Sequence, residues 1–481
     1  MHSAFHRACL TSSIALAIGA SPAFAQDEKP TEAGGLGEII VTAQKRVENL
    51  QQAPLAISAV TSETIEQRGI TDVSSLTSIA PNLVVGVTGA ATANAAIFIR
   101  GIGESDTVLT ADSPVGVYVD GVVLGRTSGA IFDLVDLERI EVLRGPQGTL
   151  YGRNTTGGAV NLISKKPGDA FAVEQTLSYG RFDYIQSKTT VDTGEWGDSG
   201  IRLRGTYLHK QRDGYIDNPL RRDSGDPGAY NTDAFRIAVR FDQGGPLRLD
   251  YTFDYNDRRG ASIPSQLIAA RPDILAYISA SPALGGEAPQ ISRKRLSSFR
   301  ADTDGPVRDK IQGHNFVAEF DLSDNLTFRS LTGYRTWKNT VVSDQDGNGG
   351  LVGLVVDPGI LAGGPLIPLG IEPISLFNLT FDRRQKQFTQ EFNLLGKIGS
   401  DIDFVLGAYY FREVVHDANP TNFTLIIPSG GPVEAAPGVF VNSVGVNLAT
   451  DNIYRHKSRS RAIFGQVTGH LTDRLSITAG L

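Results

Sequence analysis

The feature that most constrains the fold is a strict alternation of apolar and polar residues, which begins near Phe171 and recurs to the end of the chain. In segment 234–242, for example, apolar residues occupy every second position: Phe235, Ile237, Val239 and Phe241. Successive side chains of a strand point to opposite faces, so a period of two predicts strands with one apolar and one polar face. Segments of about ten residues with aromatic ends are typical of transmembrane β-strands that face lipid on one side and a polar lumen on the other.

The connections support the same architecture. We predict about eleven strands: 171–180, 184–192, 201–210, 234–242, 247–257, 314–322, 326–337, 387–396, 403–413, 461–471 and 474–481. After a first tight hairpin, short turns (193–200, 243–246, 323–325, 397–402, 472–473) alternate with long loops (211–233, 258–313, 338–386, 414–460). An outer-membrane barrel has this topology, with short periplasmic turns and long extracellular loops. A soluble antiparallel sheet is the alternative, but such frequent charges would be unusual in it.

The N-terminus predicts export. Residues 1–25 contain a basic start, an apolar run at 14–20 and an Ala23-Phe24-Ala25 cleavage site, as a secretory signal peptide does. The run is too short to span a membrane, which takes about twenty apolar residues. The only cysteine, Cys9, lies inside this signal, so the mature chain should have neither disulfides nor thiolate metal sites. Acidic and basic residues are interspersed along the chain, and the formal net charge is −7, so the composition gives no indication of nucleic-acid binding.

A polar stretch, 26–37, precedes the β-branched run EIIVTAQK at 38–45. This run predicts a strand without a neighbouring hairpin partner. It is either the first strand of the next domain or a detachable strand that pairs with the sheet edge of a partner protein by β-augmentation.

Residues 47–168 predict one α+β domain. Thr61 or Ser62 begins a short helix that ends before Gly69, and a second helix runs from Asp72 to Pro81. Strands follow around 97–102 and in SPVGVYVDGVVLG, where Asp120-Gly121 predicts a tight hairpin. An acidic turn at 133–138, the strand RIEVLRG, a glycine-rich loop and the strand AVNLIS complete the domain. The loop lacks the Lys-Ser or Lys-Thr pair of a phosphate-binding loop.

The stretch RIEVLRGPQGTLYGRNTTGGAVNLISKKP resembles the closing segment of the plug domain of TonB-dependent outer-membrane receptors. The preceding helices and strands also resemble that plug, so the resemblance covers 47–168. The resemblance implies an α+β plug followed by a transmembrane antiparallel β-barrel, 169–481. Since family barrels have twenty-two strands, we expect the chain to hold about half of one, incomplete at its C-terminus and with an open sheet edge.

The resemblance also implies site residues and partners. Segment 38–45 resembles the TonB box, through which the TonB protein of the inner membrane would couple: Glu38, Ile39, Ile40, Val41, Thr42, Ala43 and Gln44. The short spacing from the cleavage site leads us to expect no extra signalling domain. Plug arginines, Arg100 and Arg144 above all, would form ion pairs with acidic lumen residues, although solvation in a wet lumen is the alternative. The predicted latch comprises Arg100, Gly101, Glu141, Arg144, Gly145, Pro146, Gly148, Tyr151, Gly152 and Arg153.

No catalytic, metal or cofactor site is expected, because the seven histidines are scattered and no Ser/His/Asp set emerges. The expected function is uptake of a scarce extracellular ligand across the bacterial outer membrane, with ligand contacts at 87–96, 103–112 and the long loops. An iron–siderophore complex is the commonest cargo of the family; oligosaccharides, cobalamin and aromatic compounds remain open. The basic loop 257–309 suits an anionic ligand or a surface that contacts lipid and lipopolysaccharide. A passive porin would lack a folded N-terminal domain and coupling strand, and a barrel enzyme would need a catalytic set.

Overall fold

The computed structural model describes residues 40–42, 44–46, 48–70, 73–87, 95–105, 109–127, 136–220, 226–263, 265–472 and 474–481. The chain divides into two compact units, Met1–Ile39 and Ile40–Leu481. The expected signal peptide and linker, and Glu38, Ile39 and Ala43 of the expected box, lie outside the described residues, as do most of 87–96 and parts of 103–112. The structure below is that of the second unit.

The N-terminal part of this unit is built on a five-stranded mixed sheet of order β3-β9-β10-β7-β8, with a three-stranded sheet β4-β5-β6 and a short pair β1-β2. The strands are β1 (Ile40–Val41), β2 (Glu48–Asn49), β3 (Ile57–Thr61), β4 (Leu83–Val87), β5 (Ala95–Ile99), β6 (Ile102–Gly103), β7 (Val115–Val119), β8 (Val122–Leu124), β9 (Leu137–Arg144) and β10 (Gly158–Ser164). The helices are α1 (Ser62–Gln67), the 3-10 helix η1 (Val73–Ser78) and α2 (Gly148–Tyr151).

The two strands of the motif RIEVLRG…AVNLIS occupy the middle of this sheet. β10 pairs antiparallel with β9 and parallel with β7. Val142 of β9 and Val160 and Leu162 of β10 are fully buried, and Ile65 of α1 and Leu76 of η1 join the same apolar core. β10 has the nearly continuous apolar run that a strand covered on both faces needs, whereas β9 also carries Glu138, Arg139, Glu141 and Arg144.

Local expectations for this domain are mostly confirmed. Helix α1 begins after Thr61 and ends at Gln67, and Asp120 and Gly121 turn the β7–β8 hairpin with φ of 48° and 83°. The second helix was expected to be α-helical, but its described part is the 3-10 helix η1. The expected strand at 97–102 is two strands, because Arg100 and Gly101 adopt φ of 54° and 78° and reverse the chain between β5 and β6.

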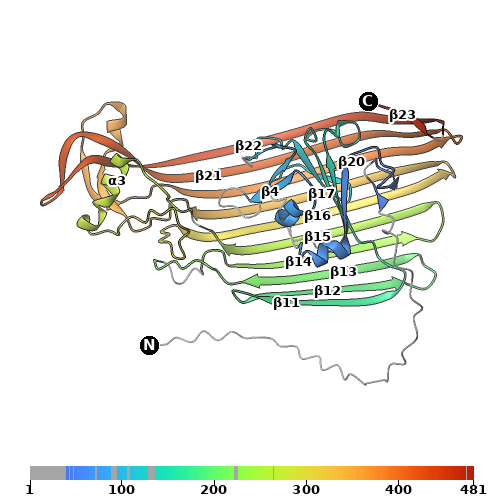
Figure 1. The fold of residues 1–481 in the computed structure, drawn as a ribbon, viewed down its shortest axis with the longest axis horizontal. Helices are drawn as coiled ribbons and strands as arrows, with labels where there is room; N and C mark the ends of the chain where they lie inside the picture. The colour runs from blue at the N-terminus through green and yellow to red at the C-terminus, as the bar shows by residue number, and fades with distance from the viewer. Residues whose placement is uncertain are drawn as a thin grey trace, which may run out of the picture. The chain divides into compact units, whose positions relative to one another are not determined.

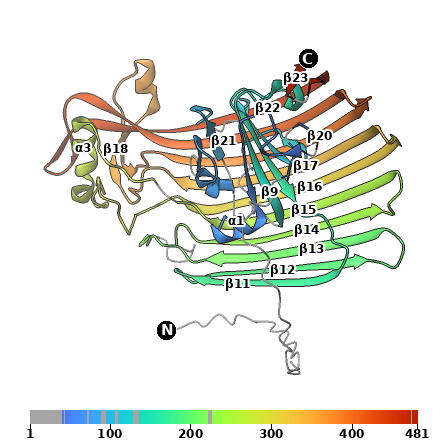
Figure 2. The same cartoon turned by 45° about the vertical axis from the view of Figure 1, so that its right-hand side comes forward.

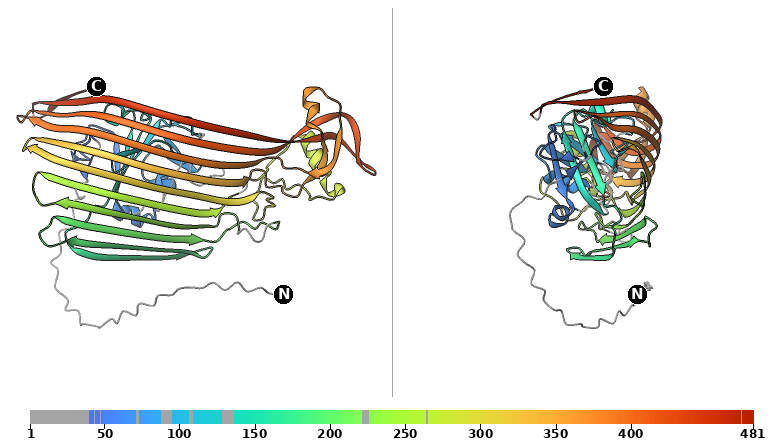
Figure 3. Two further views of the ribbon diagram at one scale, coloured as in Figure 1. Left: turned by 180° about the vertical axis from the view of Figure 1, so that it is seen from behind. Right: turned by 90° about the vertical axis from the view of Figure 1, so that its right-hand side faces the viewer.

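A sheet of thirteen strands follows, referred to below as the large sheet; its order is β11 to β17, then β20, β21, β22, β18 and β19, with β23 also paired to β22. The long strands are β11 (Phe171–Gly180), β12 (Tyr184–Glu195), β13 (Ile201–Arg212), β14 (Tyr230–Asp242), β15 (Leu247–Ala261), β16 (Asp304–Ser323), β17 (Leu326–Asp344), β20 (Asn378–Ile398), β21 (Ile402–Ala436), β22 (Val439–Thr472) and β23 (Leu475–Gly480). Figure 1 shows them side by side, with the N-terminal domain against one face. Figures 2 and 3 show that the sheet curves around that domain.

The two faces of the large sheet differ as the alternation predicts. On β14, Arg236 and Ala238 are buried towards the N-terminal domain, whereas Ile237 between them is 42 % exposed on the outer face. On β20, Phe388 and Phe392 are exposed and Thr389 and Asn393 are buried. The eleven expected strands all exist, and β11 has the expected bounds. No helix in the described ranges is long and apolar enough to cross a membrane.

The long connections are more ordered than expected. Segment 414–460 was expected to be a loop, but β21 and β22 continue as a paired hairpin up to Ala436 and Val439. Its Gly- and Pro-containing stretch is accommodated by a register shift between Pro428 and Val433. The other connections carry α3 (Pro272–Ser279), the 3-10 helices η2 (Ser281–Leu284) and η3 (Pro358–Ala362), and strands β18 (Val352–Val356) and β19 (Pro368–Pro373).

These loop elements share an apolar cluster with the tall hairpin formed by β21 and β22. Leu354 and Val356 of β18 pack with three buried valines of β22, namely Val441, Val444 and Val446. The Tyr277 hydroxyl of α3 donates a hydrogen bond to the Leu354 carbonyl at 3.0 Å. The tall hairpin is therefore stabilised by packing as well as by strand pairing.

The glycine at the start of β10 provides a test of this fold. Gly158 has φ of 149°, and an added Cβ would overlap the Leu143 carbonyl oxygen of β9. We expect Gly158→Ala to lower the free energy of unfolding of the N-terminal domain by about 1–3 kcal/mol, since the backbone contact cannot relax easily. Denaturant unfolding of the full chain in detergent micelles measures this. Gly148→Ala is the control, because nothing lies within 4 Å of the position that its Cβ would take; an equal loss in both variants would contradict the assignment.

Candidate functional site

The segment expected to couple the protein to a partner is docked. Within the described residues, Ile40–Val41 forms β1 and pairs antiparallel with Glu48–Asn49 of β2, so the expectation that it has no hairpin partner was wrong. The partner strand is only two residues long and polar, which is why the sequence did not indicate it. Val41 is fully buried.

A buried carboxylate of the N-terminal domain fastens the next residue. Thr42 donates from its backbone N–H to Glu141 Oε1 at 2.8 Å and from its hydroxyl to the same atom at 3.2 Å. Glu141, in β9, is itself fully buried and also accepts hydrogen bonds from Arg139 Nε at 2.9 Å and from Asn161 Nδ2 at 3.3 Å. Glu141 was expected to act in the latch of the domain; in the structure it binds the coupling segment instead.

Two basic residues attach the same segment to the large sheet. Lys45 forms an ion pair with Glu391 of β20, and its ammonium lies 4.8 Å from the centre of the Phe464 ring. Arg46 forms an ion pair with Asp403 of β21 at 2.9 Å and donates to the Gly396 carbonyl at 3.1 Å. Burial lowers the pKa of Lys45, and the Glu391 carboxylate acts in the opposite direction. We call the described residues 40–42 and 44–46 the coupling segment.

The coupling segment borders a cavity of about 770 Å³ between the N-terminal domain and the inner face of the large sheet. Thr42, Lys45 and Arg46 line it together with Asn325 and Lys397, which flank short turns. The cavity therefore opens at the end of the sheet that carries the short turns, away from α3 and the tall hairpin.

The two arginines on which the expected latch depends pair with no described residue of the large sheet. Arg100 lies in the exposed β5–β6 turn, and its guanidinium approaches Gly145, 3.2 Å from where a Cβ would stand. Arg144 ends β9, and its Nε is buried without a hydrogen-bond partner among the described residues. Neither forms an ion pair with any described carboxylate, so the expected Arg100 and Arg144 pairs are not found there.

The other residues of the expected latch have mixed roles. Gly101, Gly145 and Gly152 have positive φ and serve backbone turns. Pro146 is exposed, and so is Gly148, which begins α2. The Tyr151 hydroxyl accepts a hydrogen bond from Asn161 Nδ2 at 2.8 Å. Burial raises the pKa of Tyr151 well above its ordinary value, so it remains a neutral phenol.

Arg153 does contact the large sheet. It donates to the Ser458 hydroxyl of β22 at 3.0 Å, and its guanidinium lies 5.2 Å from the centre of the Phe411 ring. It also forms an ion pair with Asp112 at 2.8 Å. This residue of the expected latch lies at the interface of the N-terminal domain and the large sheet.

The buried ion pair at this interface is made by a residue that the sequence analysis did not select. Arg126, which follows β8, donates to Glu413 Oε2 of β21 at 3.0 Å from Nε and 2.7 Å from a terminal nitrogen. Glu413 is fully buried and also accepts a hydrogen bond from Gln385. Arg126 contacts Asp112 at 3.0 Å as well. The available signal was on the sheet side, where alternation places Glu413 on the polar inner face.

Further ion pairs connect the N-terminal domain to β13–β15. Arg204 binds both oxygens of Asp136, at 2.6 and 2.7 Å, and Arg236 binds Asp120 at 2.7 Å. Lys166, in the segment between β10 and β11, reaches Asp250 at 3.1 Å. The N-terminal domain is thus held on one side by β13–β15 and on the other by β20–β22.

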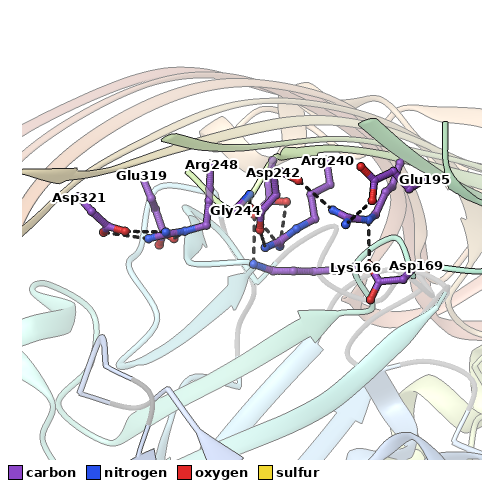
Figure 4. Close-up of polar contacts among 11 residues, drawn as sticks. Lys166, Asp169, Glu195, Arg240, Asp242, Gly244, Arg248, Glu319 and Asp321 are labelled. Carbon is purple, nitrogen blue, oxygen red and sulfur yellow. Dashed lines mark hydrogen bonds and ion pairs between the residues drawn. The ribbon is translucent and has the colours of Figure 1, made fainter. Parts of the chain in front are cut away.

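Near the short turns, arginines of the inner face lie between paired carboxylates (Figure 4). Arg240 contacts Asp242 at 2.7 Å and Asp250 at 3.4 Å. Arg248 contacts Asp321 at 2.6 Å and Glu319 at 3.4 Å. In the described part of the chain, no three His, Asp or Glu side chains gather in a way that would hold a metal ion.

Comparison with known proteins identifies this architecture. Residues 49–159 match the TonB-dependent receptor plug domain, and residues 269–481 match the TonB-dependent receptor-like β-barrel. The chain belongs to the TonB-dependent receptor family, a family of transporters rather than enzymes, and its location is the bacterial outer membrane. The N-terminal domain is the plug and the large sheet is barrel wall.

Individual relatives show what fraction of a receptor this chain matches. An iron-regulated outer membrane virulence protein of Vibrio cholerae is 34 % identical over 44 % of this chain and 33 % of its own length. The vitamin B12 transporter BtuB of Vibrio vulnificus is 28 % identical over 42 % of this chain and 32 % of its own length. The chain thus spans about a third of the curated relatives it matches. The pyoverdine receptor FpvA of Pseudomonas aeruginosa has the same fold, with a TM-score of 0.62 at 15 % identity, over 92 % of this chain and 58 % of FpvA.

The Arg126–Glu413 pair gives a test of how the plug is held. We expect Arg126→Met to lower the free energy of unfolding by about 3–5 kcal/mol, because Glu413 would stay buried without its cation. Arg100→Met should change it by no more than about 0.5 kcal/mol, since Arg100 is exposed and pairs with no described residue of the wall. Urea unfolding of the full chain in detergent micelles measures both. A larger effect at Arg100 than at Arg126 would restore the latch expected from the sequence.

Proposed function

We propose that this chain is the plug and part of the barrel of a receptor that imports a scarce extracellular ligand with energy delivered by TonB. The observation that carries the proposal is the double attachment of the coupling segment, to Glu141 inside the plug and to Glu391 and Asp403 on the barrel wall. A force on this segment acts on plug and wall at once. A passive porin is not coupled to an energy source, so it would not need such a segment.

The energetics favour release by an external force. An outer membrane has neither ATP nor an ion gradient of its own, so opening must be driven from the inner membrane. The Arg204–Asp136 and Arg236–Asp120 contacts hold the plug on β13–β15, whereas the coupling segment holds it on β20 and β21. Removing the coupling segment would widen the cavity of about 770 Å³ that it borders. This cavity is the proposed beginning of the exit path.

TonB would take hold of the segment as an added strand. Residues 38–45 are the proposed box, 1–25 the proposed signal peptide, 47–168 the proposed plug and 169–481 the proposed barrel portion. In the docked state Ile40 and Val41 pair with Asn49 and Glu48 of β2. A TonB strand would pair with the same segment by β-augmentation, and it would compete with β2 where it uses the same edge.

An iron–siderophore complex is the proposed cargo. Relatives include an iron-regulated outer-membrane protein of Vibrio cholerae and the catecholate siderophore receptor Fiu of Escherichia coli, the latter 29 % identical over 31 % of this chain. The similarity to a vitamin B12 transporter keeps cobalamin as the second candidate. Oligosaccharide and aromatic cargoes have no specific observation in their favour.

The proposal predicts that Ile40→Pro weakens or abolishes binding of the periplasmic domain of TonB to the full chain. Proline has no N–H to donate to a partner strand, so we expect a loss of affinity of about tenfold or more. Titration calorimetry with the receptor in detergent micelles provides the measurement.

Glu32→Pro, which precedes the box, is the matched control and should bind as the unaltered chain does. Equal affinity of the Ile40→Pro and Glu32→Pro receptors would show that 38–45 is not the coupling site. If TonB bound neither the unaltered chain nor either variant, the proposal of an energised receptor would be wrong and a passive barrel would be favoured.

A further inference from the structure

Two neighbouring rows of outward side chains cross the large sheet at right angles to its strands, near the long connections. The register of strand pairing gives each row one residue on every strand. Over β16, β17, β20, β21 and β22, the first row is Lys310, Lys338, Arg384, His416 and Arg455. The second row, two residues nearer the short turns, is Gln312, Thr336, Lys386, Val414 and Lys457. We call the lysines and arginines of these two rows the outer basic band.

The outer basic band faces away from the plug. Gln387 of β20 and Ser458 of β22 contact the plug, so both point inward. Because successive side chains of a strand point to opposite faces, their neighbours Lys386 and Lys457 point outward. The other members of the band are in register with these two or lie one row away. All are exposed except Lys310, which is half-buried.

The outer basic band begins where the apolar part of the outer face ends. On β20 the outward positions from the band to the short turn are Phe388, Gln390, Phe392, Leu394, Gly396 and Ile398. This stretch covers about 33 Å along the strand, or about 25 Å along the membrane normal at a strand tilt of about 40°. Lipid chains cover an apolar band about 25 Å tall on an outer-membrane barrel. The band therefore lies at the level of the lipid headgroups, on the side of the long connections.

The outer basic band occupies only one side of the wall. Over β11–β15 the first row continues as Leu177, Ser187, His209, Asp233 and Asp257. The second row continues as Gln175, Thr189, Tyr207, Phe235 and Tyr255. These ten positions hold two carboxylates and neither lysine nor arginine. A general preference for cations at the membrane interface would place them around the whole wall, so the one-sided band indicates a discrete binding site.

Positive charges in the band face one another across neighbouring strands. Lys338 stands directly opposite Lys310 on one side and Arg384 on the other. Like charges directly opposite one another destabilise a sheet. Within the described structure Lys338 and Lys386 form no ion pair, and the pair of Arg384 with Asp382, at 3.3 Å, is exposed on both sides. An anion lying across the strands would reduce this repulsion.

We propose that the outer basic band binds the phosphate groups of a lipopolysaccharide molecule in the outer leaflet of the membrane. The acyl chains would cover the apolar positions that begin at Phe388, and the phosphates would accept charge-assisted hydrogen bonds from Lys338, Arg384 and Lys386. A soluble acidic protein is disfavoured as the occupant, because the band directly adjoins positions that lipid chains cover. This site goes beyond the proposed transport function and depends only on the location in the outer membrane.

The test is binding of diphosphoryl lipid A to the full chain, measured by native mass spectrometry after release from dodecyl maltoside micelles. We expect lipid A to stay bound, and lipid A from which both phosphates have been removed to be lost. The double variant Lys338→Gln/Arg384→Gln should lower the apparent affinity about tenfold or more, because each cation near an anionic headgroup contributes to binding. Lys338→Arg/Arg384→Lys, which keeps both charges, should retain most of the affinity.

Arg293→Gln/Lys294→Gln is the matched control, because it removes the same charges from two exposed side chains in the connection between β15 and β16. It should bind lipid A as the unaltered chain does. Equal retention of the two lipids by the unaltered chain, or an equal loss in the control and in Lys338→Gln/Arg384→Gln, would overturn the site. Displacement of lipid A by millimolar inorganic phosphate would indicate a site for free anions and would overturn the assignment to lipid. TonB binding is measured separately, so its presence without lipid A binding would refute this site alone.

Discussion

A charge inside a partly dry lumen needs a partner, and much of this structure follows from that requirement. Strands with period-two alternation place apolar side chains towards lipid and polar ones inward. The inward arginines then form ion pairs with carboxylates of the plug: Arg204 pairs with Asp136, and Arg236 pairs with Asp120. The plug fits against the wall because its turns present charges that complement those of the strands. An apolar wall of the same shape would not fix the position of the plug in this way.

The charges that pair across the plug–wall interface come from opposite sides in different parts of the lumen. On β13 and β14 the plug is held by arginines of the wall and carboxylates of the plug, whereas on β20 and β21 the wall supplies the carboxylates, Glu391, Asp403 and Glu413. Plug positions that contact these carboxylates are basic: Lys45, Arg46 and Arg126. The polarity of the interface reverses across the plug, which fixes its orientation.

The sequence predicted the architecture well because its main signals are periodic and local. Alternation located all eleven long strands, and Asp120-Gly121 located a hairpin. The tall β21–β22 hairpin was missed because its Gly and Pro residues resemble a loop, while the shift at Pro428 and the packing with β18 that accommodate them are tertiary features. The plug–wall contacts were only partly predictable. Arg126 and Arg144 are equivalent in sequence terms, and only the fold decides that one faces Glu413.

The contacts of the coupling segment have a consequence for the order of assembly. Lys45 and Glu391 are separated by 346 residues, and Gln44 contacts Gln466 across 422. Loop closure over such distances is slow, and the wall residues do not exist as a surface until β20–β22 have paired. Until then the segment has no docking place, and it becomes buried only when that side of the wall is complete. Docking of this segment therefore reports that β20–β22 have formed.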